Sequence, residues 1–186
     1  MLAPRKQAAL LLSALLVFGV GPWVSRAAAP ASNVIRVQKG FVTQIGPWNA
    51  RRDSSLGAAI EAFGIPSSVR YDGPGACRAY WSSRRISALF YYRDETQRAR
   101  TRCGHVGRLD WFITGSPSWR TNAGLRVGDA TSRVRSLYPT SALRKDRLWV
   151  LTRGQIGETE EDSVRTTEAE PSGGQVKSLR AWFLED

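Results

Sequence analysis

One pattern of predicted elements occurs twice along this chain and constrains its fold more than any other feature of the sequence. The first copy begins with an amphipathic helix over Leu56–Phe63, whose apolar residues recur one helical turn apart, and Asp53–Ser55 can cap it. The second copy has a similar stripe over Val127–Tyr138, with Asp129 as the expected cap and Pro139 as the stop. We therefore expect two units with one plan.

Segments rich in aromatic and β-branched residues follow each helix and predict strands. After the first helix these segments are 78–82, 86–93 and 106–114, and after the second they are 147–152, 164–167 and 176–184. Ser83-Arg84-Arg85 is expected to form the first turn, and another strand-like piece, 34–43, precedes both units. The last strands match without a gap at an offset of 70 positions, which places Phe112 against Trp182.

These elements predict an α+β fold with an antiparallel sheet and helices packed on one face. The expected organisation is a lead-in segment at 32–52, a first helix-plus-strands unit at 53–123 and a second at 124–186. Each unit has too few elements to bury its own apolar face, so the two are expected to share one sheet. The alternative is two unrelated segments that each place a helix before strands.

Residues 1–31 have the three-part order of a secretory signal peptide. Arg5-Lys6 is followed by the apolar run Ala8–Val20, and cleavage is expected after Ala31 or after Ala27. The alternative is an uncleaved anchor, but the run has 13 residues, whereas a membrane span needs about 20. We expect a secreted or extracytoplasmic protein, monomeric and without a membrane span in its mature chain.

The chain contains two cysteines, Cys77 and Cys103. An even number of cysteines in an exported chain predicts a disulfide. Metal binding is the alternative, because His105 lies two residues beyond Cys103. Three candidate ligands are fewer than a structural zinc site uses, so we expect neither a metal nor another cofactor.

Arginine dominates the positive charge, since only four of the 27 basic residues are lysine and the formal net charge is +11. Such a surface suits anionic partners, although a bias toward arginine codons would give the same composition. No basic helix, zinc-finger spacing or RNA-binding aromatic motif is present, so nucleic acid is not an expected partner.

The sequence contains no P-loop, GxSxG or HExxH pattern. His105 is the only histidine and lies between glycines beside Cys103, so a catalytic triad is not expected. Paired carboxylates at Asp94-Glu95 and Glu160–Asp162 leave a cell-wall-active hydrolase as an alternative. The acidic stretch 158–170 reads as a solvated loop or a long hairpin, and we therefore expect a protein without catalysis.

Strand alternation predicts a binding surface in the last strand of each unit. It places Phe112 and Trp182 beside charged neighbours, on the sheet face away from the helices, with Arg180, Arg93 and Tyr91 nearby. Aromatic and arginine side chains are typical of binding hot spots. The sequence leaves open whether residues 33–48 fold over this face and bury it. The predicted function is a non-catalytic module that engages a protein or an anionic envelope component.

The segment Gly124–Asp129, followed by Tyr138-Pro139, resembles one unit of the β-lactamase-inhibitor-protein-like group, a unit shared with small outer-membrane-assembly lipoproteins. The resemblance covers about residues 41–186 and is looser in the first unit. It implies helix-turn-helix elements packed on an antiparallel sheet, often in tandem, without a catalytic site. It also implies protein binding through aromatic-rich sheet and loop surface. This chain lacks the lipoprotein cysteine, and no target follows from the matching residues.

Overall fold

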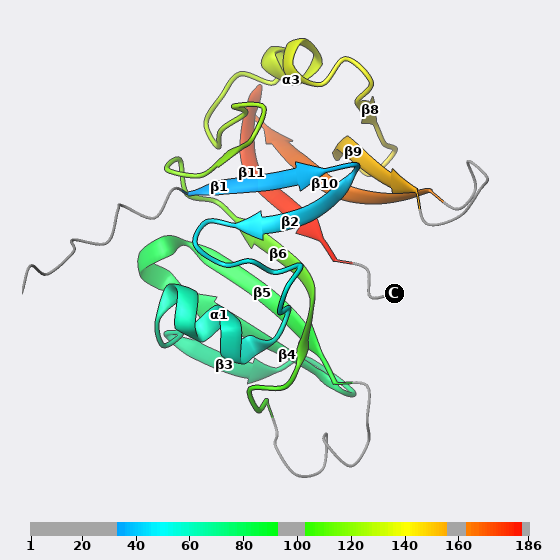
Figure 1. Ribbon diagram of the computed structural model, residues 1–186. Helices are drawn as coiled ribbons and strands as arrows, with labels where there is room; N and C mark the ends of the chain where they lie inside the picture. The colour runs from blue at the N-terminus through cyan, green and yellow to red at the C-terminus, as the bar shows by residue number, and fades with distance from the viewer. Residues whose placement is uncertain (1–32, 93–102, 156–162, 184–186) are drawn as a thin grey trace, which may run out of the picture.

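The computed structural model describes residues 33–92, 103–155 and 163–183, and these form two sheets and two short helices (Figure 1). The small sheet has the strand order β2-β1-β7, with β1 at Val34–Gln38, β2 at Phe41–Ile45 and β7 at Arg120–Thr121. The large sheet has the order β3-β4-β5-β6-β11-β10-β9-β8. Its strands are β3 (Ser68–Tyr71), β4 (Ala76–Trp81), β5 (Ile86–Tyr91), β6 (Arg108–Thr114), β8 (Ala142–Leu143), β9 (Trp149–Gln155), β10 (Ser163–Ser172) and β11 (Gln175–Trp182).

The large sheet consists of two four-stranded meanders that meet at β6 and β11. Every neighbouring pair of its strands is antiparallel, which confirms the predicted antiparallel sheet. The described part of the chain is mostly β, with α1 at Leu56–Phe63 and α3 at Ser132–Leu137. The helical share is therefore smaller than an α+β prediction implies.

The helix α1 occupies the predicted residues and begins at a side-chain cap. The hydroxyl of Ser55 accepts a hydrogen bond from the backbone N–H of Ala58 at 3.1 Å. The helix ends at Gly64, whose φ of +85° lies in the region that favours glycine. The 3₁₀ turn η1 (Ser82–Arg84), followed by Arg85, connects β4 to β5 as the sequence predicted.

The helix α3 begins later than predicted, and Asp129 is not its cap. The backbone N–H groups of Gly128 and Thr131 donate to Val176 and Gly174 at the start of β11. These bonds tie the turn that precedes the helix to the segment at the start of β11, and the helix starts at Ser132. The carboxylate of Asp129 instead accepts from the backbone N–H of Arg126 at 2.8 Å, which stabilises the turn before the helix.

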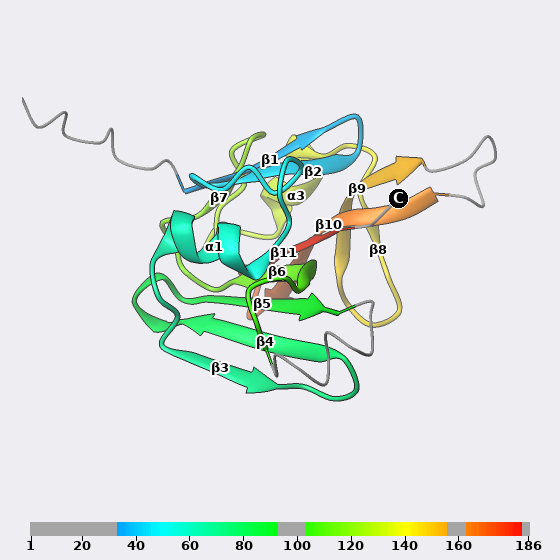
Figure 2. The same cartoon turned by 60° about the horizontal axis from the view of Figure 1, so that its bottom comes forward.

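One core cluster contains residues of both helices, of the small sheet and of the large sheet. Ile35 of β1, Phe63 of α1, Val134 of α3 and Leu179 of β11 all belong to it. Figure 2 shows α1, β1 and β2 on the same side of strands β3–β6. Trp48, beyond β2, lies 6.0 Å from Phe63 between ring centroids. The lead-in segment therefore packs on the core side of the large sheet.

The disulfide predicted from the cysteine count is present between Cys77 and Cys103, whose Cα atoms are 5.4 Å apart. The cysteines are 26 positions apart in sequence, and closing such a loop in the unfolded chain stabilises the fold by roughly 3–4 kcal/mol.

Tyr92 lies within the loop with 3% of its surface exposed. Its hydroxyl donates to the carbonyl of Gly104 at 2.5 Å, and burial raises its pKa to about 12.

The raised pKa of Tyr92 predicts a loss of stability at alkaline pH. The unfolded tyrosine titrates near 10, so its contribution is complete below about pH 10 and is lost as the pH rises toward 12. We expect the free energy of unfolding to fall by about 1–1.5 kcal/mol more between pH 9 and pH 11 in the wild type than in Tyr92→Phe. Urea unfolding at both pH values measures this, with Tyr80→Phe as an exposed control; parallel profiles for wild type and Tyr92→Phe would contradict it.

Candidate partner-binding face

Two rows of side chains cross the face of the large sheet that points away from the core. In one row Trp111 of β6 is the Cα partner of both Leu89 of β5 and Trp182 of β11, and Leu89 is the partner of Arg78. Directly paired residues share a sheet face, so these side chains lie together. The second row runs from β4 to β9 through Tyr80, Ser87, Ile113, Arg180, Glu168 and Val150. We call the surface formed by both rows, with Tyr91, the tryptophan face.

Arginines lie against both tryptophans of this face. The guanidinium carbon of Arg78 is 5.1 Å from the ring centroid of Trp111, and that of Arg180 is 5.7 Å from the ring of Trp182. Such cation–π contacts limit the conformations of both partners. Both tryptophans are partly exposed, and Tyr80 is 41% exposed. The face thus presents aromatic area to solvent at the junction of the two meanders, and both of its arginines are already paired, Arg78 with Asp72 at 2.6 Å and Arg180 with Glu168 at 3.8 Å.

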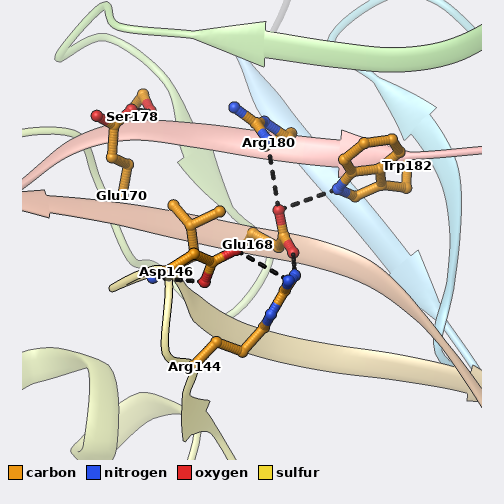
Figure 3. Close-up of polar contacts among 8 residues, drawn as sticks. Arg144, Asp146, Glu168, Glu170, Ser178, Arg180 and Trp182 are labelled. Atoms are coloured by element: carbon orange, nitrogen blue, oxygen red, sulfur yellow. Dashed lines mark hydrogen bonds and ion pairs between the residues drawn. The ribbon is translucent and has the colours of Figure 1, made fainter.

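A buried carboxylate, Glu168 of β10, holds one end of the tryptophan face in place (Figure 3). Only 1% of this residue is exposed. Its carboxylate oxygens accept from Arg144 at 3.2 Å and from the indole N–H of Trp182 at 3.0 Å. Arg180, its cross-strand partner, lies 3.8 Å away. Arg144 also pairs with Asp146 at 2.9 Å, which ties the β8–β9 turn to the same group.

These contacts give Glu168 a positioning role. Its charge is compensated by Arg144 and Arg180, and the same carboxylate orients the Trp182 indole and the Arg180 side chain. A buried ion pair of this kind needs its partners, because a lone buried charge is costly. The sequence patterns did not indicate Glu168 as a site residue. The acidic stretch forms the predicted long hairpin in part, and Glu168 lies within it in β10. The signal that could have found it is its cross-strand pairing with Arg180, which becomes known only with the strand register.

The prediction that Phe112 lies on the binding face is wrong. Phe112 is completely buried and lies 5.3 Å from Trp119 between ring centroids. The reason is a β-bulge: Leu89 and Phe90 of β5 face Trp111 and Leu109 of β6, so Asp110 is an extra residue. Strict alternation from Leu109 would place Phe112 outside, and the extra residue turns it inward.

Of the other predicted site residues, some lie on the tryptophan face and some lie outside the described residues. Trp182 and Arg180 lie together on the tryptophan face, and Tyr91, which is 45% exposed, lies on it at the end of β5. Arg93 lies outside the described residues. The segment 33–48 lies on the core side, which answers the question that the sequence left open. The carboxylates Asp94-Glu95 and Glu160–Asp162 also lie outside the described residues.

Within the described ranges, no helix is long and apolar enough to cross a membrane. In the same part of the chain, no group of three or more histidine, cysteine, aspartate and glutamate residues is placed to hold a metal ion. Comparisons with protein-family models, curated proteins and solved structures find no match to this chain.

Proposed function

We propose that this protein is an exported, non-catalytic binding module whose tryptophan face binds a partner protein. The observation that carries the proposal is the direct pairing of Trp111 with Trp182, flanked by Arg78 and Arg180, on a sheet face away from the core. Tryptophan, tyrosine and arginine are the residues most enriched in interface hot spots. Because these side chains are already held by cation–π contacts and by Glu168, less conformational freedom is lost on binding.

The partner surface that suits this face combines apolar area with hydrogen-bond acceptors, because the charges of Arg78 and Arg180 are already paired with Asp72 and Glu168. Arg78 lies in the first row, and Arg180 lies in the second row together with Tyr80 and Ile113. A protein offers both kinds of contact within one surface, whereas an anionic polymer would use mainly the arginines. We therefore favour a protein over an anionic envelope component.

Binding without catalysis is favoured by the state of the one fully buried carboxylate among the described residues. Both oxygens of Glu168 are engaged by guanidinium or indole N–H groups. A general acid or base has to exchange its proton with a substrate, and this arrangement serves positioning instead. The hydrolase alternative depends on Asp94-Glu95 and Glu160–Asp162 and has no support from the described part of the chain.

The proposal includes an origin in two copies of one unit. The order of strands supports it: β3–β6 and β8–β11 are both meanders, each follows a helix, and their last strands pair. Trp81 and Trp149 occupy the second strand of each meander, and both are buried in the core. The helix-on-one-face arrangement and the resemblance to the β-lactamase-inhibitor-protein-like group belong to the same proposal.

An extracytoplasmic location is also part of the proposal. The disulfide between Cys77 and Cys103 supports it, because such bonds persist in oxidising compartments. The signal-peptide pattern of residues 1–31 supports it independently.

The test combines site-directed crosslinking with substitution. A photoreactive amino acid at Tyr80, on the tryptophan face, is expected to crosslink one protein in the extracytoplasmic fraction, whereas the same group at Tyr71 is not. Trp111→Ala together with Trp182→Ala is expected to weaken binding of that protein at least 30-fold, because each hot-spot residue contributes about 2 kcal/mol or more. Titration with the purified partner measures the affinity.

The matched control removes a comparable exposed apolar area elsewhere. Ile65 and Tyr71 are 88% and 65% exposed and lie outside the tryptophan face, so Ile65→Ala with Tyr71→Ala should leave the affinity within about twofold. Thermal unfolding of each variant verifies the fold. Unchanged binding by a folded Trp111→Ala/Trp182→Ala variant would remove the proposed site, and crosslinking to an anionic polymer alone would replace the partner class.

A further inference from the structure

A pocket of about 420 Å³ opens on the outer side of the small sheet. Three arginines, Arg36, Arg51 and Arg52, line it together with the amides of Gln38, Gln44 and Asn49. Arg36 and Gln44 are Cα partners on β1 and β2 and so point the same way. The neighbouring pair Ile35 and Ile45 is fully buried, so the pocket lies on the side of the small sheet that faces away from the core.

The backbone around the pocket is held by the core beneath it. Trp48 and Ala50 are each 2% exposed, and the indole N–H of Trp48 donates to the carbonyl of Asp53 at 2.7 Å. The alternate residues Asn49 and Arg51 therefore point outward. The backbone N–H of Arg51 donates to the carbonyl of Thr43 at 3.3 Å, which ties this segment to β2. The backbone that carries the lining side chains is thus held in place without a ligand.

The positive charge of the pocket has no compensation from its own lining. None of the lining residues is acidic, and within the described residues no ion pair involves Arg36, Arg51 or Arg52. The nearest acidic residue in sequence, Asp53, is engaged elsewhere: its carboxylate accepts from the backbone N–H of Ser55 and faces Arg108. Like charges around one pocket repel each other, and a bound anion relieves that repulsion.

We infer that this pocket binds a phosphate group carried by a small polyhydroxy compound. Guanidinium groups pair with phosphate oxygens through two parallel hydrogen bonds, and three of them match a dianion with several acceptor oxygens better than a single carboxylate. The amide of Gln44 donates to the carbonyl of Gly46 at 2.8 Å and that of Asn49 accepts from the backbone N–H of Arg52 at 3.1 Å. Their remaining donors and acceptors, with the amide of Gln38, can bind hydroxyl groups. This site is separate from the tryptophan face and adds a small-molecule ligand to the proposed binding of a protein.

Calorimetric titration with glycerol 3-phosphate, inorganic phosphate and glycerol tests the inference on the full chain. Glycerol 3-phosphate should bind saturably at one site, inorganic phosphate more weakly, and glycerol not measurably. Arg36→Ala together with Arg51→Ala should weaken glycerol 3-phosphate binding at least tenfold, because each removes a charge-assisted contact. Arg36→Gln with Arg51→Gln, which keeps most of the side-chain length, is the second variant if the alanine pair does not fold.

The control variant, Arg126→Ala with Lys145→Ala, removes the same charge at exposed positions outside the pocket. It should keep the affinity within twofold. Absence of saturable binding to the wild type, or equal weakening in the control variant, would overturn the site. Equal affinity for inorganic phosphate and glycerol 3-phosphate would overturn the polyhydroxy part of the ligand.

Discussion

Replacing Phe112 with alanine is expected to lower the free energy of unfolding by about 3–5 kcal/mol, as large-to-small substitutions of buried aromatic residues do. The side chain is completely buried, packs against Trp119, and lies between Ala88 and Ala181 on the neighbouring strands. The methyl side chains of these two alanines are too short to fill the space that the ring leaves, so a cavity remains. Chemical denaturation monitored by tryptophan fluorescence measures the loss.

Trp182→Ala is the matched comparison. Trp182 directly follows Ala181, the residue of β11 that pairs with Phe112, and its ring lies on the opposite face of the large sheet. Its ring is partly exposed, so the expected loss of stability is smaller, about 1–2 kcal/mol. The two variants should thus differ in which property they change. Phe112→Ala should cause the larger loss in the free energy of unfolding, and Trp182→Ala the larger loss in affinity for the partner. A Phe112→Ala variant as stable as the wild type would contradict the inward orientation that the bulge at Asp110 imposes.

Removing both arginines that pair with Glu168 is the second substitution with a large expected effect. Arg144→Ala together with Arg180→Ala is expected to lower the free energy of unfolding by about 3 kcal/mol, because it leaves a buried carboxylate with less compensating charge. The side chain of Glu168 is 1% exposed in the presence of both arginines. Equilibrium unfolding in urea at neutral pH measures the change.

A third substitution shows whether the buried charge causes this loss. Adding Glu168→Leu to the double variant removes the carboxylate and is expected to restore most of the stability, since apolar replacements of buried ion pairs are often neutral or better. Exposed arginines supply the control: Arg126→Ala should change stability by less than about 0.5 kcal/mol. If the triple variant is no more stable than the double variant, lost packing of the arginine side chains would be the cause instead.

Local patterns were reliable where the structure depends on neighbours in sequence. The cap at Ser55, the apolar spacing over Leu56–Phe63 and the glycine after it define α1 within a few residues, and the helix has those bounds. The segments that became β4, β5, β6, β9 and β11 carry aromatic and β-branched residues, and each was expected near its observed position. Short strands with few such residues, β3, β7 and β8, were not anticipated, because backbone pairing with neighbouring strands defines them.

The binding face shows the limit of the same reasoning. Trp182 and Arg180 lie on the expected face because β11 alternates regularly between Leu179 and Trp182. Phe112 was placed on the wrong face because one extra residue, Asp110, interrupts the alternation of β6. The same strict alternation would place Trp111, which pairs with Trp182 on the outer face, on the core side.

The order of residues alone decided the position of α1, most strands of the large sheet and the pairing of its two cysteines, because each depends on side-chain type and spacing along the chain. Only the folded chain decided which aromatic rings are buried, how Glu168 is compensated and how three arginines come to line one pocket. The physical reason is that these features depend on strand register and on segments far apart in sequence. A single inserted residue changes the face of every side chain that follows it.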